Sequence, residues 1–166
     1  IDHSIRFLPR PADYLFLYLL SFYLLIISLK INYKYALFGS VAFGFSTYMI
    51  IILGVGHNTK ALALGYLPLI IMGVLMIFRK DFLKGFLITS LALGLQIHSN
   101  HYQMTYYTLI IVMIMFLAFL IDFLKKKDLK TFFYCFSTFT LSSLIALMMN
   151  ASGLLSTKEY SEFSTR

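Results

Sequence analysis

Apolar residues occur in long runs along this chain, separated by short polar gaps. The runs are about 16 to 22 residues long, close to the length that a helix needs to cross the ~30 Å core of a bilayer. They are too continuously apolar for barrel strands, which alternate over about ten residues, and backbone groups in lipid must be hydrogen-bonded internally. The pattern therefore predicts an all-α, polytopic membrane bundle of about six transmembrane helices, at residues 14–29, 35–55, 61–78, 82–97, 104–124 and 131–149.

The predicted bundle, residues 14–149, is flanked by two polar segments. Residues 1–13 form a leading segment with the sequence Pro9-Arg10-Pro11 near its end, which suits the first turn of a helix. Residues 150–166 are polar and are expected to begin an outer-side loop or domain. The chain has no initiator Met and no signal-peptide pattern, so we expect it to be an internal fragment of a longer protein.

Composition agrees with a membrane protein. Of the 166 residues 60% are hydrophobic and 13% are charged, whereas a soluble domain is about half apolar and a quarter charged. The net charge of +7 does not indicate nucleic-acid binding, because that function needs one continuous basic surface. The single Cys135 lies within an apolar run and excludes a disulfide within the chain.

The gaps between the runs alternate in character, which predicts an orientation. The leading segment and the gaps at 56–60 and 98–103 hold all four histidines. Together with the tail they carry five of the fourteen Lys and Arg residues, and the other gaps carry nine. The positive-inside rule places the more basic side in the cytoplasm and the histidine-bearing side outside. The nine are Lys30, Lys34, Arg79, Lys80, Lys84, Lys125, Lys126, Lys127 and Lys130.

Residues 98–107 (His-Ser-Asn-His-Tyr-Gln-Met-Thr-Tyr-Tyr) are the most unusual stretch, because they hold many hydrogen-bonding groups and no Lys, Arg, Asp or Glu. If they are helical, His98 and His101 share a face at i, i+3. Neutral donors and acceptors suit hydroxyl-rich ligands such as sugars, with the tyrosines as stacking platforms. A wet loop between two helices, which satisfies only its own backbone, explains the same residues.

Residues 56–60 (Gly-His-Asn-Thr-Lys) precede the third predicted helix. Asn58 or Thr59 is expected to cap that helix, so that its backbone N–H groups and Lys60 form an anion site for phosphate or pyrophosphate. The competing interpretation is a capped helix start with a lysine that extends to the membrane surface.

A zinc site made by His57, His98 and His101 is a sharper alternative. Catalytic zinc needs three protein ligands and usually carboxylates behind them, and no acidic residue adjoins either cluster. We therefore expect no metal or other cofactor. No spacing pairs the outer-side carboxylates Asp13, Glu159 and Glu162, so none is assigned as catalytic, and Asp122 is expected to pair with the lysines after it.

These motifs resemble the YfhO family of bacterial membrane proteins, most closely its Bacteroidetes-type members. The resemblance rests on residues 56–60, on the Asn-His-x-Gln-Met-Thr-Tyr-Tyr run at 100–107, and on the Leu-Pro-x-Pro-Ala-x-Tyr segment at 8–14. The tail, from Lys158-Glu159-Tyr160 to Ser164-Thr165-Arg166, is similar too. The resemblance covers essentially the whole chain, and its motifs occur in the same order as in the family.

The resemblance implies a fold and function of the GT-C glycosyltransferase type: a protein of the bacterial inner membrane that transfers a sugar from a polyprenyl-phosphate carrier to an envelope acceptor on the periplasmic face. In that group the key acidic residue lies in the first large outer loop, close to the N-terminus. This chain is expected to begin after that loop, so neither Asp2 nor Asp13 is assigned that role. Lys60 is expected to contact the carrier phosphate. The candidate substrate- and carrier-binding residues are His57, Asn58, Lys60, Asn100, His101, Gln103, Tyr106 and Tyr107.

Two other hypotheses fit the same sequence. A transporter or lipid flippase is expected to show broken helices, repeats and polar groups near mid-membrane. The short run at 82–97 fits such a protein, whereas no repeat is evident. A non-catalytic scaffold would use the polar gaps to bind a protein partner.

Overall fold

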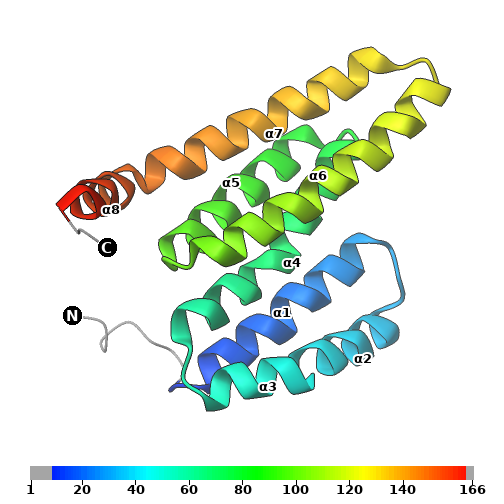
Figure 1. The fold of residues 1–166 in the computed structure, drawn as a ribbon. Coiled ribbons are helices and arrows are strands. Elements are labelled where there is room, and N and C mark those ends of the chain that lie inside the picture. Colours follow the sequence, from blue (N-terminus) through cyan, green and yellow to red (C-terminus); the bar gives the residue numbers. More distant parts are fainter. Residues whose placement is uncertain (1–8, 164–166) are drawn as a thin grey trace.

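The computed structural model describes residues 9–163, which form helices joined by short turns (Figure 1). The all-α prediction is therefore confirmed. A helix or helix pair occupies each of the six predicted ranges, whereas His3, with the rest of residues 1–8 and 164–166, lies outside the described residues. The helices are α1 (Ala12–Ser28), α2 (Tyr33–Gly44), α3 (Thr47–Gly54), α4 (Asn58–Phe78), α5 (Phe82–His98), α6 (Tyr102–Lys125), α7 (Leu129–Met149) and α8 (Ala151–Phe163).

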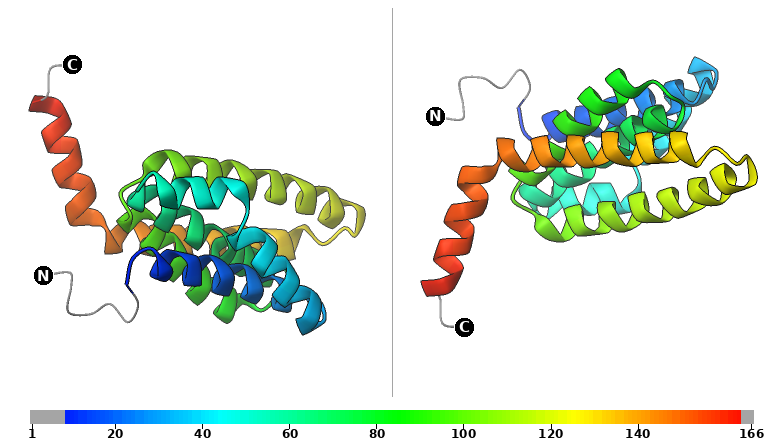
Figure 2. Two further views of the ribbon diagram at one scale, coloured as in Figure 1. Left: turned by 90° about the horizontal axis from the view of Figure 1, so that it is seen from below. Right: turned by 90° about the horizontal axis from the view of Figure 1, so that it is seen from above.

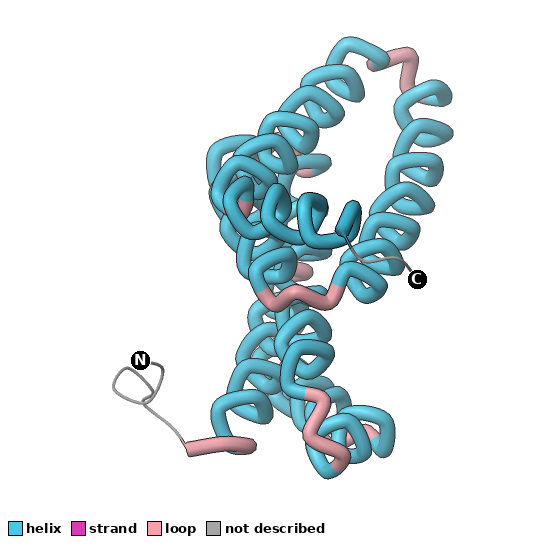
Figure 3. Tube along the Cα trace, turned by 60° about the vertical axis from the view of Figure 1, so that its left-hand side comes forward, coloured by secondary structure: helices cyan, strands magenta, loops and turns pink. Residues whose placement is uncertain are grey.

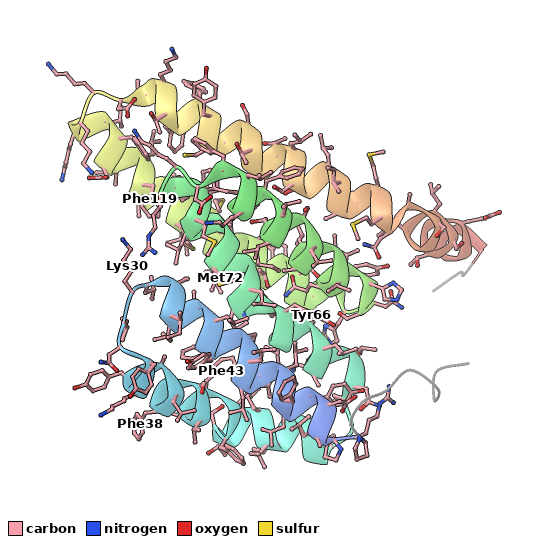
Figure 4. The ribbon with its side chains drawn as sticks, turned by 180° about the vertical axis from the view of Figure 1, so that it is seen from behind. Lys30, Phe38, Phe43, Tyr66, Met72 and Phe119 are labelled. Atoms are coloured by element: carbon pink, nitrogen blue, oxygen red, sulfur yellow. The ribbon has the colours of Figure 1, made fainter. Side chains whose placement is uncertain are left out.

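Helix α4 is the centre of the bundle. It contacts α1 and α3 on one side and α5, α6 and α7 on the other, so that the two groups of helices meet along it (Figures 1 and 3). One apolar core joins α4 to α5, α6 and α7, and a smaller core joins it to α1 and α3. Stacked rings reinforce both groups: Phe43 lies 4.5 Å from Phe22 between ring centroids, and Phe119 lies 4.0 Å from Phe78 (Figure 4).

Helices α4 and α5 approach each other through glycine. A Cβ atom on Gly73 would lie 2.9 Å from the backbone nitrogen of Thr89, and one on Gly85 would lie 2.8 Å from the backbone nitrogen of Ile77. Both distances are shorter than van der Waals contact, so the two backbones can pack this closely only where the side chain is absent. Small residues play this part between helices in lipid, where no hydrophobic effect drives helices together.

Three helices are long and apolar enough to cross a membrane alone: α4, α6 and α7. The apolar helices α1 and α5 have 17 residues each, or about 26 Å at 1.5 Å per residue, slightly less than the ~30 Å core of a bilayer. Within the most apolar window 56% of the α4 residues are buried, against 22% in α6 and 17% in α7. The outer faces of α6 and α7 therefore contact lipid.

The second predicted span, at 35–55, is wrong as a single helix. It is divided into α2 and α3, whose axes are bent by 46° at Phe45 and Ser46. Taken together, the two helices are long and apolar enough to form a fourth span. Gly44, the last residue of α2, is buried where a Cβ atom would lie 2.9 Å from Cδ2 of Leu19 in α1. Ser46 is extended at φ −60° and ψ 146°, and begins α3. Glycine and serine have low helix propensities, so little free energy is lost when the helix is interrupted at these residues. The close packing of Gly44 on α1 can therefore end α2 there.

The basic gaps come together at one end of the bundle. Arg79, in the α4–α5 turn, donates a hydrogen bond to the carbonyl of Ser28 at the end of α1. Lys80 in the same turn pairs with Asp128 of the α6–α7 turn at 3.4 Å. The pairing expected for Asp122 is confirmed, since its carboxylate lies 2.7 Å from Lys126.

Asp128 also caps helix α7. Its carboxylate accepts hydrogen bonds from Thr131, whose backbone nitrogen lies 3.3 Å from Oδ1. These hydrogen bonds, followed by the nearby Lys80, lower the pKa of Asp128 below its usual range. Three lysines at the basic end, Lys80, Lys84 and Lys126, thus pair with aspartates at the surface.

The segment after Asn150 is helical over its described part. Helix α8 leaves α7 at a wide angle, beyond the end of the bundle (Figure 2). Most of its described side chains are exposed, and Leu154 packs against the main core. This segment corresponds to residues 150–166, for which we predicted the start of an outer-side loop or domain.

Candidate functional site

The predicted site residues occupy two short segments at the same end of the bundle, opposite the basic turns (Figure 1). The first segment is the start of α4, with His57, Asn58 and Lys60. The second is the α5–α6 turn and the first turns of α6, with Asn100, His101, Gln103, Tyr106 and Tyr107. Helices α4 and α6 contact each other within the bundle.

Lys60 lies in the first turn of α4, because this helix begins at Asn58, three residues earlier than predicted. Its side chain is half-buried, and Nζ lies 5.4 Å above the ring centroid of Tyr48 in α3, a cation–π distance. Among the side chains that the structure describes, no carboxylate forms an ion pair with it. It differs in this respect from Lys80, Lys84 and Lys126, which pair with aspartates at the other end.

The capping prediction for Asn58 and Thr59 is wrong. The N-cap residue is His57, and no side chain forms a cap hydrogen bond at this helix start. Gly56 precedes it with φ at 77°, a left-handed conformation that glycine adopts without strain. The turn that Gly56 makes places Asn58 inside the helix, where its side chain cannot cap. The N-terminal N–H groups of α4 are therefore left without a side-chain acceptor, beside the ammonium group of Lys60.

The histidines of the second segment do not share a helical face, which corrects the i, i+3 prediction. His98 is the last residue of α5, and His101 is the N-cap residue of α6. Between them Asn100 has φ at 58°, a left-handed conformation that ends α5 and that asparagine tolerates better than most residues. Part of the role of Asn100 is thus to turn the chain between two helices.

His101 is half-buried, and its Nδ1 atom is buried without a hydrogen-bond partner within the described residues. In the first turn of α6, Gln103 donates a hydrogen bond of 2.8 Å to the hydroxyl of Tyr107. The neighbouring Tyr106 is largely exposed, with its ring centroid 5.9 Å from that of Tyr107. An unpaired imidazole nitrogen, an ordered amide and two accessible aromatic rings thus lie along one stretch of chain.

Gln96, which the sequence analysis did not single out, connects the two segments beneath the surface. Its side chain is fully buried and donates hydrogen bonds to the carbonyl of Ala63 in α4, at 2.8 Å, and to the hydroxyl of Thr108 in α6, at 3.0 Å. Thr108 in turn donates to the carbonyl of Met104. A buried amide joins α4, α5 and α6 close to Lys60 and His101. A lone glutamine within the apolar run at 82–97 was the signal for it.

The described residues contain no cluster suited to a metal. Within the described range, no three His, Cys, Asp or Glu side chains come close enough to hold a metal ion. His57 lies at the start of α4, apart from the α5–α6 turn that holds His98 and His101. The arrangement gives no support to the zinc alternative.

These features define a multi-pass, all-helical membrane protein with a polar, hydrogen-bonding end and a basic, ion-paired end. Residues 14–159 match the family model described as bacterial membrane protein YfhO, so the chain belongs to the YfhO family. The resemblance found in the sequence is thereby confirmed. No curated protein and no solved structure shows a significant match.

Proposed function

We propose that this chain is part of a membrane glycosyltransferase of the GT-C type, which transfers a sugar from a polyprenyl-phosphate carrier to an envelope acceptor. The observation that carries the proposal is the position of Lys60. This cation has no carboxylate partner among the described side chains, and it lies at an uncapped helix start on the same end as the neutral segment 100–107. A phosphate group complements the charge of Lys60 and the N–H groups of the helix start, and the hydroxyl groups of a sugar complement the neutral segment.

In the proposed reaction the hydroxyl oxygen of the acceptor bonds to the anomeric carbon of the sugar as the bond from that carbon to the phosphate oxygen breaks. The proton of the hydroxyl passes to a base, and the phosphate leaves on its carrier. Lys60 and the N–H groups at the start of α4 stabilise the negative charge on the departing phosphate. His101, Gln103 and the tyrosines orient the sugar. We assign no catalytic base within residues 9–163.

The proposal places the polar end of the bundle on the periplasmic side of the bacterial inner membrane, because the basic turns favour the cytoplasm. Cysteine labelling tests this orientation well, since the single native Cys135 is fully buried and should not react. We expect Thr59→Cys to react with a membrane-impermeant maleimide in cells whose outer membrane alone is opened. Lys130→Cys, at the equivalent second position of α7, should react only after the inner membrane is opened. The reverse pattern would invert the orientation.

Replacement of His101 tests the sugar side of the site. We expect His101→Ala to reduce transfer of radiolabelled sugar from polyprenyl phosphate by about tenfold or more, because one hydrogen bond to the sugar is lost. The full-length protein in nanodiscs is the material, and its melting temperature should stay within a few degrees of the wild type. Transfer at the wild-type rate by a folded His101→Ala protein would remove this segment from the proposed site.

A lipid flippase is the second candidate, and the bent α2–α3 pair favours it, since broken helices are frequent in transporters. The break at Phe45 is largely exposed, which fits a lipid-facing bend better than a transport path. A full-length protein that moves the carrier across the membrane without transferring its sugar would establish this alternative.

A further inference from the structure

Two adjoining cavities lie where α5, α6, α7 and α8 meet, beside the segment 98–107. One has a volume of about 200 Å³ and is lined by polar residues from the α5–α6 turn, the end of α7 and α8. The other, of about 260 Å³, is almost entirely apolar and lies between α5, α6 and α7. Both are lined by Ile97, Tyr102 and Leu154. We call the pair the α5–α8 cleft, with a polar mouth and an apolar interior.

Among the described residues that line it, the polar mouth holds hydrogen-bonding groups and no lysine, arginine or carboxylate. Its polar lining residues are His98, Asn100, Tyr102, Asn150 and Thr157. Lys60, which we assign to the carrier phosphate, is not among them. An anionic head group would find no lysine or arginine among these described lining residues, whereas hydroxyl groups can both donate to and accept from them.

Asn150 supplies a built hydrogen-bond acceptor in the mouth. Its side chain is 9% exposed, and its amide nitrogen donates to the carbonyls of Gly94 and Ala146, both at 2.9 Å. Only the NH₂ group can face two carbonyl oxygens, so these bonds fix the orientation of the amide. Oδ1 then has no partner within the described residues. It can accept a hydrogen bond from a hydroxyl group in the cavity.

The apolar interior suits a hydrocarbon chain. Its wall includes Leu109 of α6 and Leu147 of α7, both of which are also partly exposed on the outer surface of these lipid-facing helices. Thr105 of α6 also lines this wall, although its hydroxyl oxygen is buried beneath the wall and lacks a partner in the described structure. The surface that the interior offers to a ligand is therefore apolar throughout.

We infer that the α5–α8 cleft binds an uncharged, hydroxyl-bearing glycerolipid, with its acyl chain in the interior and its head-group hydroxyl at Asn150. Diacylglycerol is the simplest lipid of this kind. The cleft lies beside His101, so the bound hydroxyl is positioned to be the acceptor; this role rests on the proposed function, whereas binding itself does not. The carrier phosphate at Lys60 and the acceptor lipid in the cleft would then approach the neutral segment from two sides.

The test uses the full-length protein in nanodiscs with diacylglycerol that carries a photoreactive diazirine in its acyl chain. We expect crosslinks in peptides that cover residues 97–109 and 143–157. Leu154→Trp fills the wall shared by the two cavities and should lower crosslinking about tenfold. Leu155→Trp is the matched control, because Leu155 lies next in the helix, is 66% exposed and lines neither cavity.

Thr105→Val gives a second variant that keeps the shape of the cleft and should fold normally. Because the hydroxyl of Thr105 does not open into the cavity, crosslinking should stay within about twofold of the wild type. A loss of about tenfold would place the head group at Thr105 and overturn its assignment to Asn150. Equal crosslinking by phosphatidylglycerol with the same diazirine would overturn the assignment of an uncharged head group. Crosslinks elsewhere, or an equal effect of both tryptophan variants, would overturn the cleft as the site.

A transfer assay on the same nanodiscs separates this inference from the proposed function. The acceptor role is supported if radiolabelled sugar is transferred to diacylglycerol and if Leu154→Trp lowers the rate of that transfer. Cleft crosslinking together with transfer to some other acceptor overturns that role and leaves the glycosyltransferase intact. Cleft crosslinking with no transfer to any acceptor overturns the proposed function and, with it, the acceptor role.

Discussion

Replacing Lys60 with alanine is expected to reduce sugar transfer about a hundredfold, the effect of removing one preorganised group that stabilises a developing negative charge. The side chain lies above Tyr48, has no partner among the carboxylates whose side chains the structure describes, and stands at an uncapped helix start. It is thus available to an incoming phosphate. The measurement is the initial rate of transfer from radiolabelled carrier by the full-length protein.

Lys34→Ala is the control for this substitution. Lys34 also lies in the first turn of a helix, α2, but at the basic end of the bundle. We expect it to transfer at the wild-type rate, and Lys60→Arg to retain part of the activity because it keeps the charge without the shape of an ammonium. Equal losses in Lys60→Ala and Lys34→Ala would mean that surface charge matters and the position of Lys60 does not.

Substitution of Gly73 by alanine is expected to have the largest effect on stability, with the free energy of unfolding lowered by about 3 kcal/mol. The new Cβ atom would lie 2.9 Å from the backbone nitrogen of Thr89, and a backbone atom cannot move aside as a flexible side chain can. Helices α4 and α5 would have to separate, and α4 is the centre of the fold. The fraction of protein that stays monodisperse in detergent after heating measures the loss.

Gly54→Ala provides a control with the opposite expected sign. A Cβ atom on Gly54 meets nothing within 4 Å, so the higher helix propensity of alanine should leave stability unchanged or raise it by up to about 1 kcal/mol. If both alanine variants stabilise the protein, the close approach of α4 and α5 does not contribute as the structure indicates.

The length of the apolar runs was enough to predict the helices, because lipid excludes almost every other backbone conformation. It could not predict the break at Phe45 and Ser46. The residues at the break are as apolar as those of the helices on either side, so composition does not mark it. At the break Gly44 packs on Leu19 of another helix, a contact that no local pattern contains. The two 17-residue helices α1 and α5 were found by the same pattern, although each falls slightly short of a full crossing.

The sequence placed the two site segments at one end of the bundle, since alternate gaps of an up-and-down bundle emerge on the same side. Their local geometry was harder to predict. The left-handed Asn100 separates His98 from His101, and its Ser-Asn context was a readable sign of a helix end. The link from Gln96 to Ala63 and the amide of Asn150 at Gly94 depend on which helices pack together, which no local pattern contains.

Transfer in membrane vesicles of defined orientation tests the central claim most directly. A water-soluble, short-chain polyprenyl-phosphate sugar would be added to the outside of vesicles that contain the full-length protein. In the proposed orientation right-side-out vesicles expose the polar end with Lys60 and His101, and we predict that they transfer the sugar, whereas inside-out vesicles do not. Transfer by inside-out vesicles alone, or by neither kind, would contradict a carrier-dependent site at this end of the protein.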